Sequence, residues 1–320
     1  MGKMDEKSMK TLVTGSNGLV GVALRKYLGE DNFYQFKSGA DKPGKVDLTD
    51  RSNTNSYFEQ VSSLGCDTVI HCAARVGGIK ANMDDNQGFF HDNYIINKNV
   101  LEASYKNGIK NFVSILSTCI FPDKDVTYPL TADQINNGAP HSSNYGYSYA
   151  KRLLGYETNI FRNVSNNNWI SVIPTNVYGC GDNFNLNDGH LIPALIHKAY
   201  LAKRDNTDFI IWGNGKPLRQ FIYSDDLARA IMWALENWNK DLPFMAINER
   251  EYSVEEIALI IARIFDIDKE RIKFDSTKPS GQFRKPAKTD LPSTFKFTPI
   301  EEGIKISIDW FIKNYNNARK

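Results

Sequence analysis

The sequence has no long apolar run and no excess of one charge. None of its hydrophobic segments approaches the roughly 20 residues that a membrane-spanning helix needs. Lys and Arg number 39 and Asp and Glu number 37, so the formal net charge is only +2. Without a basic patch to attract phosphates or anionic lipids, we predict neither a nucleic-acid partner nor a membrane partner.

Cysteine is scarce as well. The four cysteines are Cys66, Cys72, Cys119 and Cys180, and no two of them have the C-x-x-C spacing of a zinc site or a redox pair. We therefore predict no metal site. The first ten residues, MGKMDEKSMK, are polar and lack the apolar core of a secretory signal, so we expect a cytoplasmic protein with reduced thiols.

The first half of the sequence alternates β-rich and helical segments. Strands are expected at 10–15, 33–37, 67–74, 110–118 and 169–179, with helices at 21–28, 93–108 and 147–164. Short apolar strands that alternate with helices indicate a parallel sheet covered on both faces. We predict an α/β fold with a Rossmann-type, doubly wound parallel sheet.

Beyond residue 178 the pattern loosens. A polar, Gly- and Asn-rich loop at 179–189 precedes a helix at 191–203, and 219–238 is typical of a strand and helix that return to the first domain. A further helix is expected to begin at Ser253, which acidic residues follow. We predict a large domain of residues 1–177 plus about 220–247, and a smaller, discontinuous α/β domain of about 178–219 and 248–320.

Three glycines follow the first expected strand. Glycine allows a tight turn there and lets backbone N–H groups approach a pyrophosphate at the N-terminus of the next helix. The G-x-x-G-x-x-G spacing is typical of the short-chain dehydrogenases/reductases, whereas a glycine triplet alone also occurs in ordinary turns. We predict that a dinucleotide contacts Gly15, Ser16, Asn17, Gly18, Leu19, Val20 and Gly21.

The end of the second expected strand indicates which dinucleotide binds. An acid there would hold a ribose 2′-hydroxyl and repel a 2′-phosphate, but the sequence has Lys37 and Ser38. A cation and a hydroxyl favour NADP(H), and the alternative is that Lys37 is an ordinary solvated lysine. Further cofactor contacts are predicted in the segments VDLTD and HCAARVGG, at Asp47, Leu48, Ala73, Ala74 and Val76.

Tyr147 and Lys151 have the i, i+4 spacing that places two side chains on one helix face. A phenol has an ordinary pKa near ~10, and a neighbouring ammonium is expected to lower it. Tyr147 can then protonate an oxygen as hydride reaches its carbon, while Lys151 holds the cofactor's ribose. The Y-x-x-x-K pattern by itself is common and usually structural, so its position after a dinucleotide fold gives it weight.

Ser117 and Cys119 stand two residues apart at the end of an expected strand. Side chains at i and i+2 of an extended chain point to the same side. They either line a reaction site or are small residues packed at a strand end. Ser117 with Tyr147 and Lys151 would form a carbonyl-reductase set, and such a set stabilises both an alkoxide and an enolate. The enolate would give Cys119 a role in moving a neighbouring proton.

Several segments taken together identify a family. The sequence resembles the GDP-L-fucose synthases, which are GDP-4-keto-6-deoxy-mannose 3,5-epimerase/4-reductases of the extended short-chain dehydrogenase/reductase family. The resemblance covers almost the whole chain and rests on TGSNGLVG, HCAARVGGIKAN, LSTCIFPD, YGYSYAKR, IPTNVYG, DNFN…DGHLIPALIHK, WGNGKPLRQFIYSDDLA and FDSTKPSGQFRK.

This resemblance implies a reaction and a proton-transfer pair. The 4-keto sugar GDP-4-dehydro-6-deoxy-D-mannose would be epimerised at C3 and C5 and then reduced at C4 by NADPH to GDP-L-fucose. The family's acid/base cysteine and histidine match Cys119 and His190. A thiol and an imidazole have ordinary pKa values near ~8.5 and ~6.5, close enough to neutrality for both roles. The alternatives are that Cys119 is a small buried core residue and that His190 is an ordinary histidine of a surface loop.

The resemblance also implies binding residues and a homodimer. The large domain would bind NADP(H), with Pro174, Asn176, Val177 and His190 as added contacts, and the smaller domain would bind the nucleotide sugar. Implied substrate contacts are Ser117, Cys119, Asn176, Lys198, Trp212, Arg219 and Lys285, with Arg284 as an alternative to the last. The remaining histidines, His71, His91, His141 and His197, match no motif and are expected to be structural.

Two departures from the family pattern put details in doubt. The family's GPHDNF is GCGDNF here, so Cys180 and Gly181 replace Pro and His and are expected to loosen the loop before His190. Ser280 stands where the family has an acid, which puts one expected substrate contact in doubt.

Two other functions fit the same fold. One is a 4-epimerase with tightly held NAD, which an acid after the second strand would favour, and none is present. The other is an NADP-binding regulatory protein, which would be expected to lack Tyr147 or Lys151. The epimerase/reductase remains the leading hypothesis because it alone gives Cys119 and His190 a role.

Overall fold

The structure is a computed structural model that describes residues 9–35, 37–38, 45–124, 126–278 and 283–320. The helices are α1 (Leu19–Leu28), α2 (Arg51–Ser63), α3 (Ile79–Asp84), α4 (Asn86–Lys106), α5 (Tyr145–Ser165), α6 (Leu191–Asp205), α7 (Ser224–Asn237), α8 (Val254–Ile264) and α9 (Ile300–Lys313). The strands are β1 (Thr11–Thr14), β2 (Phe33–Gln35), β3 (Lys37–Ser38), β4 (Lys45–Val46), β5 (Thr68–His71), β6 (Asn111–Ile115), β7 (Asn168–Pro174), β8 (Asn176–Tyr178), β9 (Phe209–Trp212), β10 (Leu218–Tyr223), β11 (Phe244–Ala246), β12 (Glu251–Ser253) and β13 (Ile272–Asp275).

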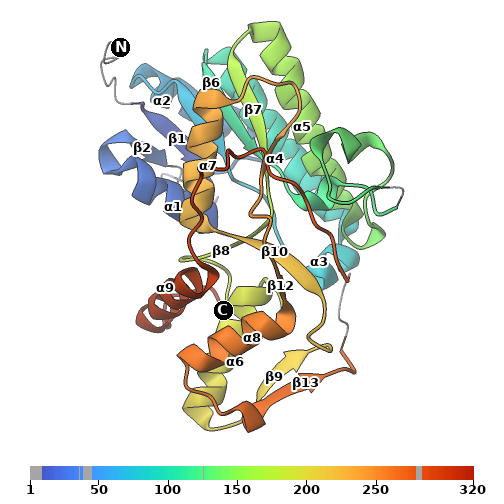
Figure 1. The fold of residues 1–320 in the computed structure, drawn as a ribbon. Coiled ribbons are helices and arrows are strands. Elements are labelled where there is room, and N and C mark those ends of the chain that lie inside the picture. Colours follow the sequence, from blue (N-terminus) through green and yellow to red (C-terminus); the bar gives the residue numbers. More distant parts are fainter. Residues whose placement is uncertain (1–8, 36, 39–44, 125, 279–282) are drawn as a thin grey trace.

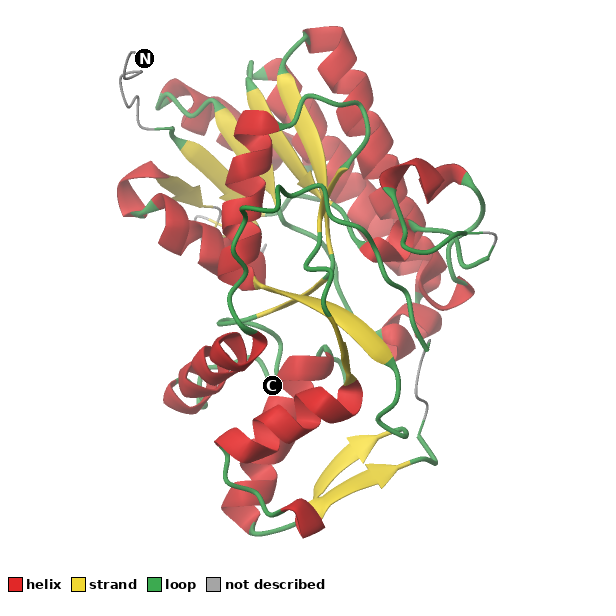
Figure 2. Ribbon diagram, viewed as in Figure 1, coloured by secondary structure: helices red, strands yellow, loops and turns green. Residues whose placement is uncertain are grey.

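A six-stranded sheet in the order β11-β7-β6-β5-β1-β2 forms the larger part of the molecule (Figure 1). Every neighbouring pair in it is parallel. Every residue of strands β1 and β5 is buried, which requires that both faces of the sheet are covered. Figure 2 shows helices in front of this sheet and behind it. The prediction of an α/β, Rossmann-type parallel sheet is confirmed.

Alternation along each strand divides the core into two layers. Leu12, next to Val13 in β1, packs with α2, α4 and α5 on one face, while Val13 packs with α1 and α7 on the other. Phe112 and Val113 of β6 divide in the same way. Because the chain passes from β1 to β2 on one side and later to β5 on the other, the strand order reverses between β1 and β5. Open α/β sheets bind ligands at such a point.

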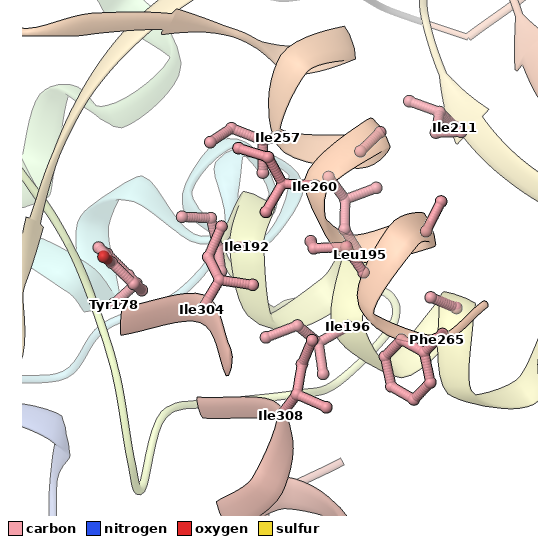
Figure 3. Close-up of a cluster of buried hydrophobic side chains, with 14 of the residues drawn as sticks. Tyr178, Ile192, Leu195, Ile196, Ile211, Ile257, Ile260, Phe265, Ile304 and Ile308 are labelled. Carbon is pink, nitrogen blue, oxygen red and sulfur yellow. The ribbon is translucent and has the colours of Figure 1, made fainter. Parts of the chain in front are cut away.

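A second core forms from residues that follow Tyr178. Figure 3 shows aliphatic side chains of α6, α8 and α9 meeting in it, among them Ile196, Ile257 and Ile308. The helix α8 begins with a capping box, in which Ser253 Oγ accepts from Glu256 N and the Glu256 carboxylate accepts from Ser253 N. The exact division of the chain into two domains stays a prediction.

One strand prediction is wrong in detail. The segment 169–179 is not one strand, since β7 ends at Pro174 and β8 leaves the large sheet to pair with β10. The strand and helix expected at 219–238 are β10, which joins β8 and β12 in a three-stranded sheet, and α7, which packs on the large sheet. The sixth strand of the large sheet is β11. None of the helices within the described ranges combines the length and apolar character of a bilayer span.

Candidate functional site

The glycine turn after β1 lies at the reversal of strand order. Gly15 has φ +68°, and a Cβ added there would lie 2.8 Å from Ala73 N, in the segment that follows β5. A Cβ on Gly21 would lie 2.5 Å from Gly15 O. Gly18 is the N-cap of α1, and no side chain caps this helix. The glycines therefore bring the turn against its neighbours and leave the first N–H groups of α1 free of a side-chain partner.

A buried hydrogen-bond chain holds this turn in register with the rest of the site. Thr14 Oγ1 accepts from Ala73 N at 3.1 Å and lies 2.7 Å from His71 Nδ1. The other ring nitrogen of His71 lies 3.0 Å from Asn97 Oδ1, and Asn97 Nδ2 donates to Ala150 O on α5. Burial lowers the pKa of His71 to about 3, so its ring is neutral. Both ring nitrogens of His71 thus have partners within the protein, in keeping with the structural role predicted for it.

Other predicted cofactor residues lie in the segments that follow β4 and β5. Asp47 and Leu48 follow β4, where Asp47 Oδ1 accepts from Thr49 N and Thr49 Oγ1, and Leu48 O accepts from Asn99 Nδ2. Val76 is 55% exposed. The backbone of Lys37–Ser38 forms β3, but the side chains of both residues lie outside what the structure describes, as does Ser280 altogether. The choice between NAD and NADP by Lys37 therefore stays a prediction.

Ser117 and Cys119 are neighbours for a different reason from the one expected. The strand β6 ends at Ile115, and Thr118–Ile120 forms a 3-10 turn that Ser117 caps. Ser117 Oγ accepts from Cys119 N at 3.3 Å. The prediction that an extended strand directs both side chains to one side is wrong, because a turn joins them instead.

Helix α5 carries Tyr147 and Lys151 to the same place. Lys151 is 2% exposed, and its Nζ donates to Ile115 O at 2.8 Å and lies 5.9 Å from the centre of the Tyr147 ring. Burial lowers the pKa of Lys151 to about 8. Burial raises the pKa of Tyr147 above its ordinary value, and the nearby Cys119 raises it further. The expectation that the ammonium lowers the tyrosine pKa is therefore wrong, since loss of hydration outweighs it.

The Cys119 thiol is half-buried within this group. Burial raises its pKa, while the nearby hydroxyl groups of Ser117 and Ser148 and the positive charges of Lys285 and Lys151 act to lower it. The Ser148 hydroxyl is buried against the sulfur without a well-aligned hydrogen bond. The structure thus brings Ser117, Cys119, Tyr147 and Lys151 together at the end of β6.

His190 comes from the other part of the chain. It is the N-cap of α6, and its side chain is 56% exposed. The loop before it packs on Gly78, where an added Cβ would lie 3.6 Å from Asp188 Cα. Gly181 in this loop has φ +78°, and its carbonyl accepts from Arg319 Nη2 at 2.8 Å. The loop is therefore tied to the C-terminal segment at Gly181. Its loosening relative to the family's Pro-His sequence stays a prediction.

Four other predicted substrate residues lie in β8, α6, β9 and β10. Lys198 Nζ lies 4.2 Å from the centre of the Trp212 ring, which is 46% exposed, and burial lowers the pKa of Lys198. Arg219 is half-buried, donates to Leu218 O at 2.8 Å and forms no ion pair with a described carboxylate. Asn176 is exposed, and its Nδ2 donates to Gln220 O, while Pro174 at the end of β7 is buried and Val177 half-buried.

A returning segment brings Lys285 to the catalytic group. Leu130 N donates to Pro286 O, and Gln220 holds Ala287 by two hydrogen bonds, 2.8 Å to its N and 3.0 Å to its O. Lys285 is half-buried, and burial lowers its pKa while the nearby Cys119 acts to raise it. Arg284 instead forms an exposed ion pair with Glu251, its Nε 2.9 Å from Oε1. Of the two alternatives, Lys285 is the one beside Cys119.

Sequence reasoning missed the residues that hold the site from behind. Thr14 and Asn97 join the glycine turn to α5, Gln220 fixes the segment of Lys285, and Asp182 lies behind His190. Only Gln220 gave a signal, as a polar side chain inside the apolar run RQFIY that is 5% exposed in the fold.

The residues present fit a dinucleotide. The uncapped N-terminus of α1 offers backbone N–H groups to a pyrophosphate, and the closeness of Gly15 to Ala73 leaves no space there for larger side chains. Lys151 supplies an ammonium that donates to Ile115 O and can also meet a ribose hydroxyl. Ser117 and Tyr147 supply hydroxyl groups suited to a carbonyl oxygen.

The close approach at Gly15 can be separated from its backbone angle. We expect Gly15→Ala to weaken NADPH binding at least about tenfold, which is about 1.4 kcal/mol, because its Cβ meets the backbone of Ala73. Gly108→Ala is the matched control, since Gly108 has φ +66° but nothing within 4 Å of its added Cβ. Fluorescence titration with NADPH measures both, and equal affinities would contradict the close-approach account.

The buried ammonium of Lys151 predicts a pH dependence of stability. An unfolded lysine keeps its proton up to about 10.5, whereas the folded protein releases it near about 8. Between these values the unfolded state binds more protons, so stability rises with pH. The parent should gain about 1.4 kcal/mol relative to Lys151→Met between pH 7 and pH 9. Urea unfolding measures this, with the exposed Lys110→Met as a control for losing any lysine; a constant difference would show the pKa is not lowered.

Comparisons with known proteins agree with this geometry. The model of the NAD dependent epimerase/dehydratase family matches residues 11–248. A GDP-L-fucose synthase of Dictyostelium discoideum is 44% identical over 97% of this chain and 97% of its own, and a probable GDP-L-fucose synthase of Drosophila melanogaster is 38% identical over 97% and 99%. The crystal structure of a GDP-L-fucose synthetase from Naegleria fowleri bound to NADP has a TM-score of 0.89 and 36% identity, covering 99% of this chain and 96% of that one. The chain therefore belongs to the NAD dependent epimerase/dehydratase family and, within it, to the family of the GDP-L-fucose synthases.

Proposed function

We propose that this protein is an NADPH-dependent epimerase/reductase that converts GDP-4-dehydro-6-deoxy-D-mannose to GDP-L-fucose. The observation that carries the proposal is the position of Cys119 beside a complete carbonyl-reductase set. Ser117 Oγ accepts a hydrogen bond from Cys119 N within one turn, and Tyr147 and Lys151 reach that turn from α5. A simple reductase needs the set alone, whereas an epimerase also needs a proton-transfer group at this place.

Ser117 and Tyr147 hold the C4 oxygen of the sugar. Their hydroxyl groups stabilise negative charge on that oxygen, whether it belongs to an enolate or to an alkoxide. Burial raises the pKa of Tyr147, so the phenol keeps its proton at neutral pH and has it to give to the alkoxide. Bound NADPH supplies the hydride for C4. Lys151, fixed by Ile115 O, orients that end of the site.

Cys119 and His190 remove protons from C3 and C5 of the sugar and deliver protons to these carbons. Protons at both carbons are acidic because each carbon lies next to the C4 ketone. Inversion needs one group to remove a proton and another to deliver one to the opposite face. Cys119 belongs to the large sheet's end and His190 to the start of α6, so they reach the sugar from two separate elements.

The remaining contacts suit a nucleotide sugar. Trp212 offers an exposed ring for stacking, with Lys198 above it. The half-buried Arg219 forms no ion pair with a carboxylate of the described residues and can hold a diphosphate oxygen. Lys285, beside Cys119, adds a positive charge near the sugar. These residues follow Tyr178, in agreement with a smaller nucleotide-sugar-binding domain, and we place the enzyme in the cytoplasm.

The first experiment follows NADPH absorbance with GDP-4-dehydro-6-deoxy-D-mannose. The parent should oxidise NADPH and yield GDP-L-fucose, while Cys119→Ser should lose the L-sugar product by about 10²-fold or more, because a serine hydroxyl is a far weaker acid than a thiol and does not ionise near neutral pH. Product is identified by NMR.

Each outcome decides a different part of the proposal. A Cys119→Ser enzyme that forms GDP-L-fucose at the parent rate would make Cys119 a packing residue and leave only the reductase. Absence of NADPH oxidation by the parent would overturn the substrate itself.

A homodimer is the proposed assembly. Tyr156, Ile160 and Val164 of α5 stand at i+4 spacing and are 43%, 59% and 66% exposed. Tyr105 of the neighbouring α4 is 42% exposed, and its ring centre lies 5.2 Å from that of Phe161 with the rings tilted by 42°. An apolar stripe of this kind on a soluble surface favours burial against another copy.

The stripe can be tested by charge. We expect light scattering to give a dimer for the parent and a monomer for Ile160→Glu combined with Val164→Glu, because two buried carboxylates have no partner there. Ile312→Glu, at a residue of α9 that is 47% exposed, is the control and should stay dimeric. A monomeric parent, or a dimeric double variant, would rule out this interface.

A further inference from the structure

Asp182 is a buried carboxylate directly behind an exposed histidine. Its side chain is 4% exposed, whereas that of His190 is 56% exposed, and His190 Nδ1 lies 4.0 Å from Asp182 Oδ1. Oδ1 also accepts from Asn183 N at 2.7 Å. The other oxygen, Oδ2, is buried and has no hydrogen-bond partner among the described residues. A buried carboxylate with an unused oxygen is costly, so its position calls for a cause outside packing.

Few charged groups surround this carboxylate. His190 at the N-terminus of α6 and Arg319 of the C-terminal segment are the two whose positive charges act on it. Arg319 is already engaged, since its Nη2 donates to Gly181 O. Burial raises the pKa of Asp182 to about 6, and His190 acts to lower it. The His190 imidazole is therefore the group whose positive charge most stabilises the ionised Asp182 carboxylate, and the carboxylate in turn stabilises a protonated imidazole.

We propose that Asp182 is the positioning residue of His190, accepting a hydrogen bond from Nδ1–H and so directing Nε2 to the sugar. This inference rests on the proposed function. The present 4.0 Å separation is longer than a hydrogen bond, and such contacts tighten when substrate binds. The exposed histidine side chain has the freedom to move, while the buried Asp182 does not.

The proton balance is the same for either role of His190. When Nε2 takes a proton from C3 or C5, the C–H electron pair passes to the C4 oxygen as an enolate and the ring becomes an imidazolium. When Nε2 gives the proton back to carbon, the enolate pair forms the new C–H bond and the ring becomes neutral. Nδ1 keeps its proton throughout, and the negative charge of Asp182 stabilises the imidazolium.

The test measures epimerisation without reduction. GDP-4-dehydro-6-deoxy-D-mannose is incubated in D2O without NADPH, and loss of the C3 and C5 proton signals is followed by NMR. We expect Asp182→Asn to slow the maximal exchange rate about 10- to 100-fold with little change in KM, and to leave NADPH affinity unchanged. Asp188→Asn, in the same loop but exposed, is the control and should exchange like the parent.

Rescue separates positioning from mere structural support. Asp182→Ala leaves space for a small anion beside His190, and we expect added formate to restore a large part of its exchange rate. Asp182→Asn has no such space and should not respond. Parent-like exchange in Asp182→Asn, or a slow Asp182→Ala that formate leaves unchanged, would overturn the proposal.

A measurement on the unaltered protein covers the case in which both variants fail to fold. In the protein bound to GDP-L-fucose, the 15N shifts of the His190 ring should show the proton on Nδ1, and an Nε2–H tautomer there would overturn the proposal. No exchange by the parent would instead overturn the proposed epimerisation itself. Exchange by the parent with no effect of Asp182→Asn would leave the enzyme's function standing and reject only the role of Asp182.

Discussion

The hydrogen bond from Lys151 Nζ to Ile115 O fixes the geometry on which the whole site depends. It joins α5 to the end of β6, and the 3-10 turn of Ser117 and Cys119 begins directly after that strand. A charge that is 2% exposed has few ways to be satisfied, so its partner is well defined. Tyr147, one helical turn earlier, thereby faces the same turn.

Burial of this group shifts the pKa values of its side chains, at a cost in folding stability. It lowers the pKa of Lys151 to about 8 and raises that of Tyr147 and Cys119. Each charged form is disfavoured by loss of water, so the pKa of Lys151 moves toward neutrality, whereas those of Tyr147 and Cys119 move away from it. The residues that follow Tyr178 contribute exposed groups instead, His190 and Trp212 among them, which remain free to meet a substrate.

Local patterns predicted the parts of the site that depend on sequence neighbours. Tyr147 and Lys151 share a helix face because of their spacing, and the glycines close the turn after β1 because only glycine fits there. The pairing of Ser117 with Cys119 was predicted for the wrong reason, since the strand ends early and a turn forms. The tyrosine pKa was predicted in the wrong direction because burial depends on the surrounding fold. Gln220 and Asp182 were missed because their partners, Ala287 and His190, are set by three-dimensional packing.

The sequence by itself determined the α/β class, the glycine turn, the Y-x-x-x-K helix and the family, because these follow from periodicity and from residues close along the chain. Only the tertiary structure decided which strand joins which sheet, that Lys285 rather than Arg284 lies beside Cys119, and that Asp182 stands behind His190. Those outcomes depend on contacts between residues far apart in sequence and on how much water each group loses. Both are properties of the packed molecule, and no local pattern carries them.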